Sequence, residues 1–241
     1  MADNKTSSNL PYAILGDSHV SSFLVGARQA GGEHLIVGGG WAAATAYFEP
    51  FFDVLDGRIS PFEDLVRYGL WKKVSGTDIN DCHGRLIISM GLASIPATNM
   101  RLWRSVGRNS MSRGLINTII DDLQVHVVRF YDALIDRGLL AAVYDPPAPS
   151  ASHPVFKMVP RELIDEVATR YRAPVLERVK KANLPLIRLP VEGPDGFIDP
   201  KYAGSDPAHA SPAIGPHVVA ALKALGATPP HPKPGPAAGR P

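Results

Sequence analysis

The stretch Tyr12-Ala13-Ile14-Leu15-Gly16-Asp17-Ser18-His19 sets the fold that this sequence predicts. Its first four residues have strand character, and an apolar pattern of helical spacing begins at Val20. Open α/β sheets present their ligands at such strand ends, and backbone N–H groups of the turn lie close to any oxyanion formed there. Ser18 is therefore a candidate nucleophile. Because Ser and Asp also favour the N-cap of a helix, an interpretation of Asp17 and Ser18 as caps stays open.

A second informative stretch, Ser205-Asp206-Pro207-Ala208-His209, precedes the last helical pattern at 218–225. Asp206 and His209 are three positions apart on a loop that contains proline. At this spacing the carboxylate can hold the Nδ1–H of the imidazole, which leaves Nε2 free to accept a proton from a serine. The pair therefore has the base and the orienting carboxylate that serine catalysis requires.

Gly16-Asp17-Ser18 after the first strand and Asp206-x-x-His209 before the last helix together resemble the SGNH (GDSL-type) hydrolases. The resemblance spans roughly residues 12–225, but its specific motifs are these two ends. It implies a serine esterase that works through an acyl-enzyme, with Ser18, His209 and Asp206 as the catalytic triad. Neither a cofactor nor a metal ion is expected.

The resemblance also implies an oxyanion hole. The N–H of Ser18 is its first expected donor. The second comes from the Gly38–Gly40 loop, expected to follow a short strand at 34–37, with Gly40 favoured and Ala43 kept open.

The third donor of the family is the Asn of a Gly-x-Asn-Asp pattern after the third strand, and here the sequence departs from that pattern. Gly91-Leu92-Ala93-Ser94 places Ala93 at the Asn position. Loss of one such donor typically costs about 10²–10³ in rate. Asn99 is the predicted replacement and Ser94 the alternative.

Other residues near these motifs are predicted to contact the substrate: Asp17, His19, Trp41 and His153. His153 lies on the loop 145–160, which should overhang the crevice; the alternative for His153 is an exposed loop histidine without a partner. An arginine-bearing segment is a candidate site for an anionic substrate group, with a solvated surface as the alternative. Its members are Arg101, Arg104, Arg108 and Arg113.

Short apolar strands alternating with helical patterns predict an α/β fold, a three-layer α/β/α sandwich around a five-stranded, mainly parallel sheet. Such a fold is SGNH hydrolase-like and flavodoxin-like. One domain is expected over 11–226, between a disordered N-terminus (1–10) and a disordered Pro/Gly-rich tail (227–241). Pro174 is expected to kink or break the helix predicted at 162–182. Phe51 and Phe52 are expected in the core.

Composition narrows the function further. The 241 residues are 45% apolar and 20% charged, as in an ordinary globular protein. The net charge of +2 comes without a basic block, so no nucleic-acid partner is expected. The N-terminus lacks the apolar segment of a secretory signal, no stretch is long enough to span a membrane, and Cys82 is the single cysteine. A cytoplasmic location is therefore expected, and the oligomeric state stays open.

Two alternatives to an esterase of a soluble glycan or small metabolite ester remain. The first is a weak or inactive SGNH-like protein that binds a glycan or an acylated ligand, motivated by Ala93. The second is an acyltransferase on the same triad. Hydrolysis and transfer differ only in which acceptor the pocket admits, so the sequence does not separate them.

Overall fold

The computed structural model describes residues 11–41, 49–62, 78–93, 98–99, 103 and 112–227. Its central element is a sheet of five strands in the order β2-β1-β5-β6-β7, with every neighbouring pair parallel. The strands are β1 (Tyr12–Gly16), β2 (Ile36–Trp41), β5 (Leu86–Ser89), β6 (Leu140–Asp145) and β7 (Leu186–Arg188). The predicted α/β class and five-stranded sheet are therefore confirmed.

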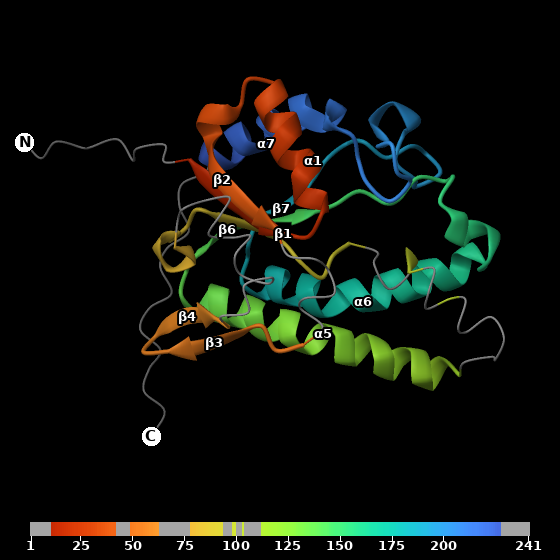
Figure 1. The fold of residues 1–241 in the computed structure, drawn as a ribbon, viewed down its shortest axis with the longest axis horizontal. Coiled ribbons are helices and arrows are strands. Elements are labelled where there is room, and N and C mark those ends of the chain that lie inside the picture. The colour runs from red at the N-terminus through yellow and green to blue at the C-terminus, as the bar shows by residue number, and fades with distance from the viewer. Residues whose placement is uncertain are drawn as a thin grey trace, which may run out of the picture.

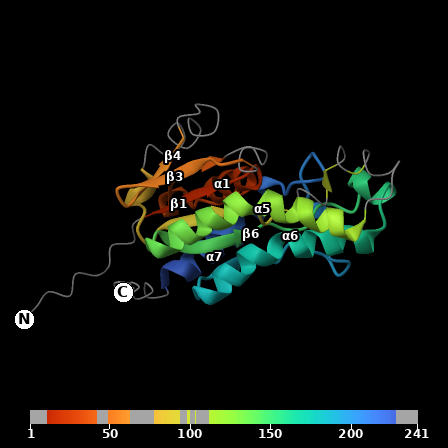
Figure 2. The same ribbon diagram turned by 90° about the horizontal axis from the view of Figure 1, so that it is seen from below.

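Helices cover both faces of this sheet (Figure 1). On one face lie α1 (His19–Gln29) and α7 (Gly215–Ala227), and on the other lie α5 (Arg113–Asp136) and α6 (Arg161–Lys181). Figure 2 shows α5 and α6 side by side along the second face.

Side chains of β1 alternate between the two faces, as the two-residue period of a strand requires. Ile14 packs with α1 and α7, whereas Ala13 and Leu15 pack on the side of α5. Both faces of β1 are therefore buried, which explains its continuous apolar run.

A hairpin of β3 (Phe52–Leu55) and β4 (Arg58–Pro61) packs against α5. Its turn is Asp56-Gly57, with φ angles of 50° and 73°, the pair of positive angles that favours Gly and Asp in two-residue hairpins. The ring of Phe52 lies 4.9 Å from that of Phe130. Phe52 is buried and Phe51 packs against the same cluster, so the prediction that both belong to the core is confirmed.

One local prediction is wrong, and a second is wrong in part: the helix does not break at Pro174, while a kink there stays a prediction. Gly38–Gly40 belong to β2 and pair with Ala13–Leu15 instead of forming a loop. Three glycines have no strand preference of their own, and their pairing with β1 makes them part of a strand. Pro174 lies inside α6, which runs unbroken from Arg161 to Lys181. The proline removes one backbone hydrogen bond, while buried Tyr171 and Val175 on either side hold the helix against its neighbours.

The strand order places the end of β1 at a topological switch point. From β1 the chain first adds β2 on one side, and the later strands continue on the other side through β5. Crevices at the carboxyl ends of such strands are where open α/β sheets bind ligands. Ser18 follows β1 at this point.

Gly16 is where β1 comes closest to its neighbours. A Cβ at this position would clash with the backbone oxygen of Ser89 and lie 2.5 Å from Cγ1 of Val20. Gly16→Ala is therefore expected to lower the free energy of unfolding by about 1–3 kcal/mol, measured by urea denaturation.

Gly114→Ala is the matched control. A Cβ there would meet only Ser112 Oγ, at an ordinary 3.7 Å, and Ala is favoured over Gly in a helix by about 0.5–1 kcal/mol. Equal effects of the two substitutions would contradict the close approach at Gly16.

Candidate active site

Ser18 lies between β1 and α1, and its side chain is exposed. It stands at the N-cap of α1, yet its hydroxyl makes no capping hydrogen bond. Instead, Ser18 Oγ lies 2.6 Å from Nε2 of His209. The hydroxyl is thus directed to a residue 191 positions away in the sequence, so Ser18 does not act as a helix cap.

His209 lies on the loop between η5 (Pro200–Tyr202) and η6 (Pro212–Ile214). Its Nδ1 is 2.8 Å from both carboxylate oxygens of Asp206. Because a carboxylate only accepts hydrogen bonds, Nδ1 carries the proton and Nε2 is free to accept the hydroxyl of Ser18. The structure thus brings Ser18, His209 and Asp206 together in the predicted order.

Asp206 is held in its ionised form. Burial opposes the charge, but the hydrogen bonds from His209 and from the Ala208 N–H, at 2.8 Å, outweigh it and keep the pKa of Asp206 below its ordinary 3.8. The carboxylate is therefore ionised across the neutral range. Its side chain is 57% exposed and that of His209 is 28% exposed, so both side chains are accessible to solvent.

Neighbouring elements fix the loop that carries Asp206 and His209. Ser22, one turn after Ser18 on α1, donates its hydroxyl to the carbonyl of Ala210 at 2.5 Å. The Ser150 N–H donates to the carbonyl of Pro207 at 2.7 Å. Sequence reasoning missed both serines. For Ser22 the available signal was its spacing of four residues from Ser18, which places both on one side of α1.

Asp17 and His19, the two residues beside Ser18 that were predicted to contact substrate, bond each other. Asp17 is fully buried. Its Oδ1 accepts the N–H of His19 at 3.0 Å and lies 2.9 Å from Nδ1 of the same residue. Because Nε2 of His19 is also engaged, 3.2 Å from the Ala208 carbonyl, both ring nitrogens are bound within the protein. For both residues, contact with substrate stays a prediction.

His153 is buried and not exposed. Its Nδ1 accepts the N–H of Val155 at 3.2 Å and caps η4 (Pro154–Lys157). Burial lowers the pKa of His153, and the charge of Asp206 opposes this only in part. His153 therefore favours the neutral form beside the Asp206 loop, and contact with substrate stays a prediction.

The predicted oxyanion donors have mixed outcomes. Gly40 lies within β2, level with Leu15, and not in a loop; Ala43 lies outside the described residues. Ala93 is buried and its methyl group supplies no donor. The carbonyl of Asn99 accepts the N–H of Trp103 at 3.1 Å, and the role of Asn99 in an oxyanion hole stays a prediction.

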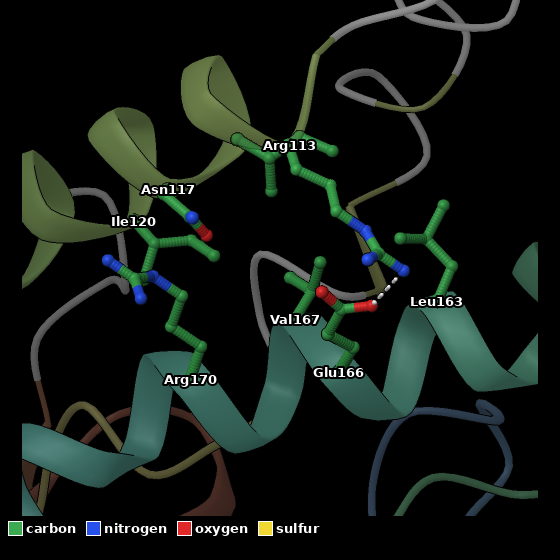
Figure 3. A pocket seen from close by; sticks show the side chains of 8 residues that line it. Arg113, Asn117, Ile120, Leu163, Glu166, Val167 and Arg170 are labelled. Atoms are coloured by element: carbon green, nitrogen blue, oxygen red, sulfur yellow. Dashed lines mark hydrogen bonds and ion pairs between the residues drawn. The ribbon is translucent and has the colours of Figure 1, made fainter.

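Five predicted positions are not described in side-chain detail. The side chain of Trp41 lies outside the described residues, as do Ser94, Arg101, Arg104 and Arg108. Arg113 begins α5, where it pairs with Glu166 of α6 at 3.2 Å. Figure 3 shows the two side chains pointing toward each other across a hollow between these helices. The hollow contains none of the triad residues, so it is separate from the candidate site.

Asp145 is a second buried acid at the carboxyl end of the sheet, which the sequence analysis did not single out. It follows Tyr144 at the end of β6 and pairs with Arg172 of α6 and with Arg188 of β7, the latter at 2.8 Å. The signal for it was an aspartate directly after an apolar strand. Through its two arginine partners Asp145 links β6, β7 and α6 by ion pairs, so it is not a free carboxylate.

Comparisons with known proteins give no match from which a function could be assigned, so the site is interpreted from its geometry. No protein-family model matches the sequence, and no curated protein matches it significantly. Within the described ranges, no three His, Cys, Asp or Glu side chains gather as a metal site would require. None of the helices in those ranges combines the length and the apolar character needed to cross a membrane.

Proposed function

We propose that this protein is a serine hydrolase of SGNH type that cleaves acyl or acetyl esters. The observation that carries the proposal is the chain of contacts from Ser18 Oγ to His209 Nε2, at 2.6 Å, and from His209 Nδ1 to Asp206, at 2.8 Å. The order of these groups is that of a nucleophile, a general base and an orienting carboxylate. The strand order and the location of Ser18 at the switch point support an SGNH-like fold.

In the proposed reaction, His209 Nε2 removes the hydroxyl proton as Ser18 Oγ bonds to the ester carbonyl carbon. The same proton then passes to the leaving alcohol as the carbon–oxygen bond breaks, which gives the acyl-enzyme. His209 next deprotonates a water that attacks the acyl carbon, and Ser18 regains its proton. Asp206 remains ionised throughout and stabilises the imidazolium form of His209.

Stabilisation of the oxyanion is the weakest feature of this site. The N–H of Ser18 is a proposed donor at the N-terminus of α1, where backbone amides and the helix dipole favour negative charge. Ala93 contributes no side-chain donor. Turnover is therefore expected to be slower than that of a three-donor site, in line with the cost of about 10²–10³ for one missing donor.

The proposed substrates are esters of a soluble glycan or a small metabolite. Ser18 and Asp206 are both exposed, which suits attack on a group carried by a larger soluble molecule. Ala93 also favours a second candidate, a binding protein that holds an acylated ligand without turning it over.

A single experiment distinguishes the two. The full chain is incubated with p-nitrophenyl acetate and, separately, with a fluorophosphonate. The hydrolase proposal expects steady release of p-nitrophenol and a mass gain of one phosphonyl group per chain, with hydrolysis lost in parallel. A chain that neither releases p-nitrophenol nor gains the phosphonyl group would support the binding protein and overturn the hydrolase.

A further inference from the structure

His19 links the two halves of the candidate site. It is the first residue of α1, directly after Ser18. Its Nδ1 lies 2.9 Å from Asp17 Oδ1, and its Nε2 lies 3.2 Å from the carbonyl oxygen of Ala208, next to His209. One imidazole therefore joins the turn of the nucleophile to the loop of the base.

The two partners of His19 define its protonation. A carboxylate oxygen and a carbonyl oxygen are both acceptors, so each ring nitrogen needs a hydrogen to bond its partner. Only the imidazolium form has both. Desolvation of the ring opposes this charge, but Asp17 and the Ala208 carbonyl outweigh it and raise the pKa of His19 above its ordinary 6.5.

We propose that His19 is a positioning residue whose imidazolium clamps the Asp206–His209 loop to the Ser18 turn. This inference rests on the proposed hydrolase function. A neutral imidazole has one N–H and makes only one of the two bonds, which frees either the Asp17 side or the loop. Because a displacement of about 1 Å can cost 10²-fold in rate, release of the loop lowers the reactivity of Ser18.

The charged and titratable groups that face His19 are known within the described residues. Asp17 lies on the turn after β1, and Asp206 acts on His19 from the loop. The ring of His209 lies 4.5 Å away, centroid to centroid. Two carboxylates thus favour the imidazolium of His19, and both lie on the elements that it joins.

The variant His19→Gln tests the clamp, because an amide is never charged and does not titrate. The measurement is the second-order rate of phosphonylation by a fluorophosphonate between pH 5.5 and 9.5, expressed as the ratio of wild type to variant. A raised pKa means that the contribution of His19 is complete below 6.5 and is lost as the pH rises through the raised value. The ratio is therefore expected to be about 10 or more at low pH and to approach 1 at high pH.

The exposed His34 supplies the matched control. His34→Gln is expected to label at the wild-type rate at every pH. A ratio for His19→Gln that is 1 throughout, or that is constant with pH, overturns the inference, since loss of packing alone does not titrate.

Ring ¹⁵N NMR of the wild-type protein gives a second readout that needs neither activity nor a stable variant. The clamp requires one histidine that is coupled to the Ala208 carbonyl and whose pKa lies above the ordinary 6.5. A His19 that titrates at or below 6.5 overturns the inference by itself. A charged His19 in a protein that no fluorophosphonate labels overturns both the hydrolase function and the catalytic role of the clamp.

Discussion

The Ser18→Ala variant is expected to lose turnover of p-nitrophenyl acetate by about 10⁶, as for removal of the nucleophile from a protease triad. The reason is that Oγ, 2.6 Å from His209 Nε2, is the proposed attacking atom. Because the hydroxyl is exposed and caps no helix, its removal should leave the melting temperature within the error of the wild type. Steady-state kinetics and thermal unfolding measure the two effects.

Ser21→Ala is the control for this substitution. Ser21 is an exposed serine on the same helix, and its loss should change neither turnover nor stability. If Ser18→Ala retained a tenth of the wild-type turnover, Ser18 would not be the nucleophile.

The Asp206→Asn variant is expected to fold normally while kcat falls by about 10⁴. An amide oxygen can still accept the Ala208 N–H that Asp206 accepts at 2.8 Å, so the loop keeps that bond. Its NH₂ group, however, donates toward His209 Nδ1 and favours the tautomer with the proton on Nε2. In that tautomer Nε2 cannot remove the proton of Ser18.

Asp199→Asn is the matched control, because Asp199 likewise accepts a backbone N–H two residues ahead, that of Lys201 at 3.0 Å. This variant should keep full turnover. A loss of only a few-fold in Asp206→Asn would reduce Asp206 to a loop cap, with His209 oriented by another group.

The sheet could be predicted because its strands are short apolar runs separated by helical patterns. The hydrophobic period also defined α5, where buried Ile120, Val127 and Leu134 recur on one face. Local patterns could not predict that Gly38–Gly40 belong to a strand, because these residues are in a strand only through their pairing with β1. Nor could they show that packing around Tyr171 and Val175 outweighs the helix-breaking effect of Pro174.

The hairpin of β3 and β4 carried a usable signal that the sequence analysis did not use. Asp56-Gly57 stands between Phe52–Leu55 and Arg58–Pro61, and Asp-Gly between such segments is a strong hairpin signal.

For the site, the residue types of the two motifs were enough to propose Ser18, Asp206 and His209. Burial was not readable at this level. Asp17 and His153 are polar residues near a predicted crevice, yet both are enclosed by the protein. In the second Asp–His pair, Asp17 with His19, the imidazole also bonds the carbonyl of Ala208, which is 189 positions away in the sequence. No local spacing can reveal that contact.

The central claim is that Ser18 is the nucleophile, and peptide mapping tests it most directly. The full chain is treated with a fluorophosphonate and digested, and the modified residue is located by tandem mass spectrometry. The hydrolase proposal predicts a single phosphonyl group on Ser18. A phosphonyl group on any other residue, or no modification, would contradict it.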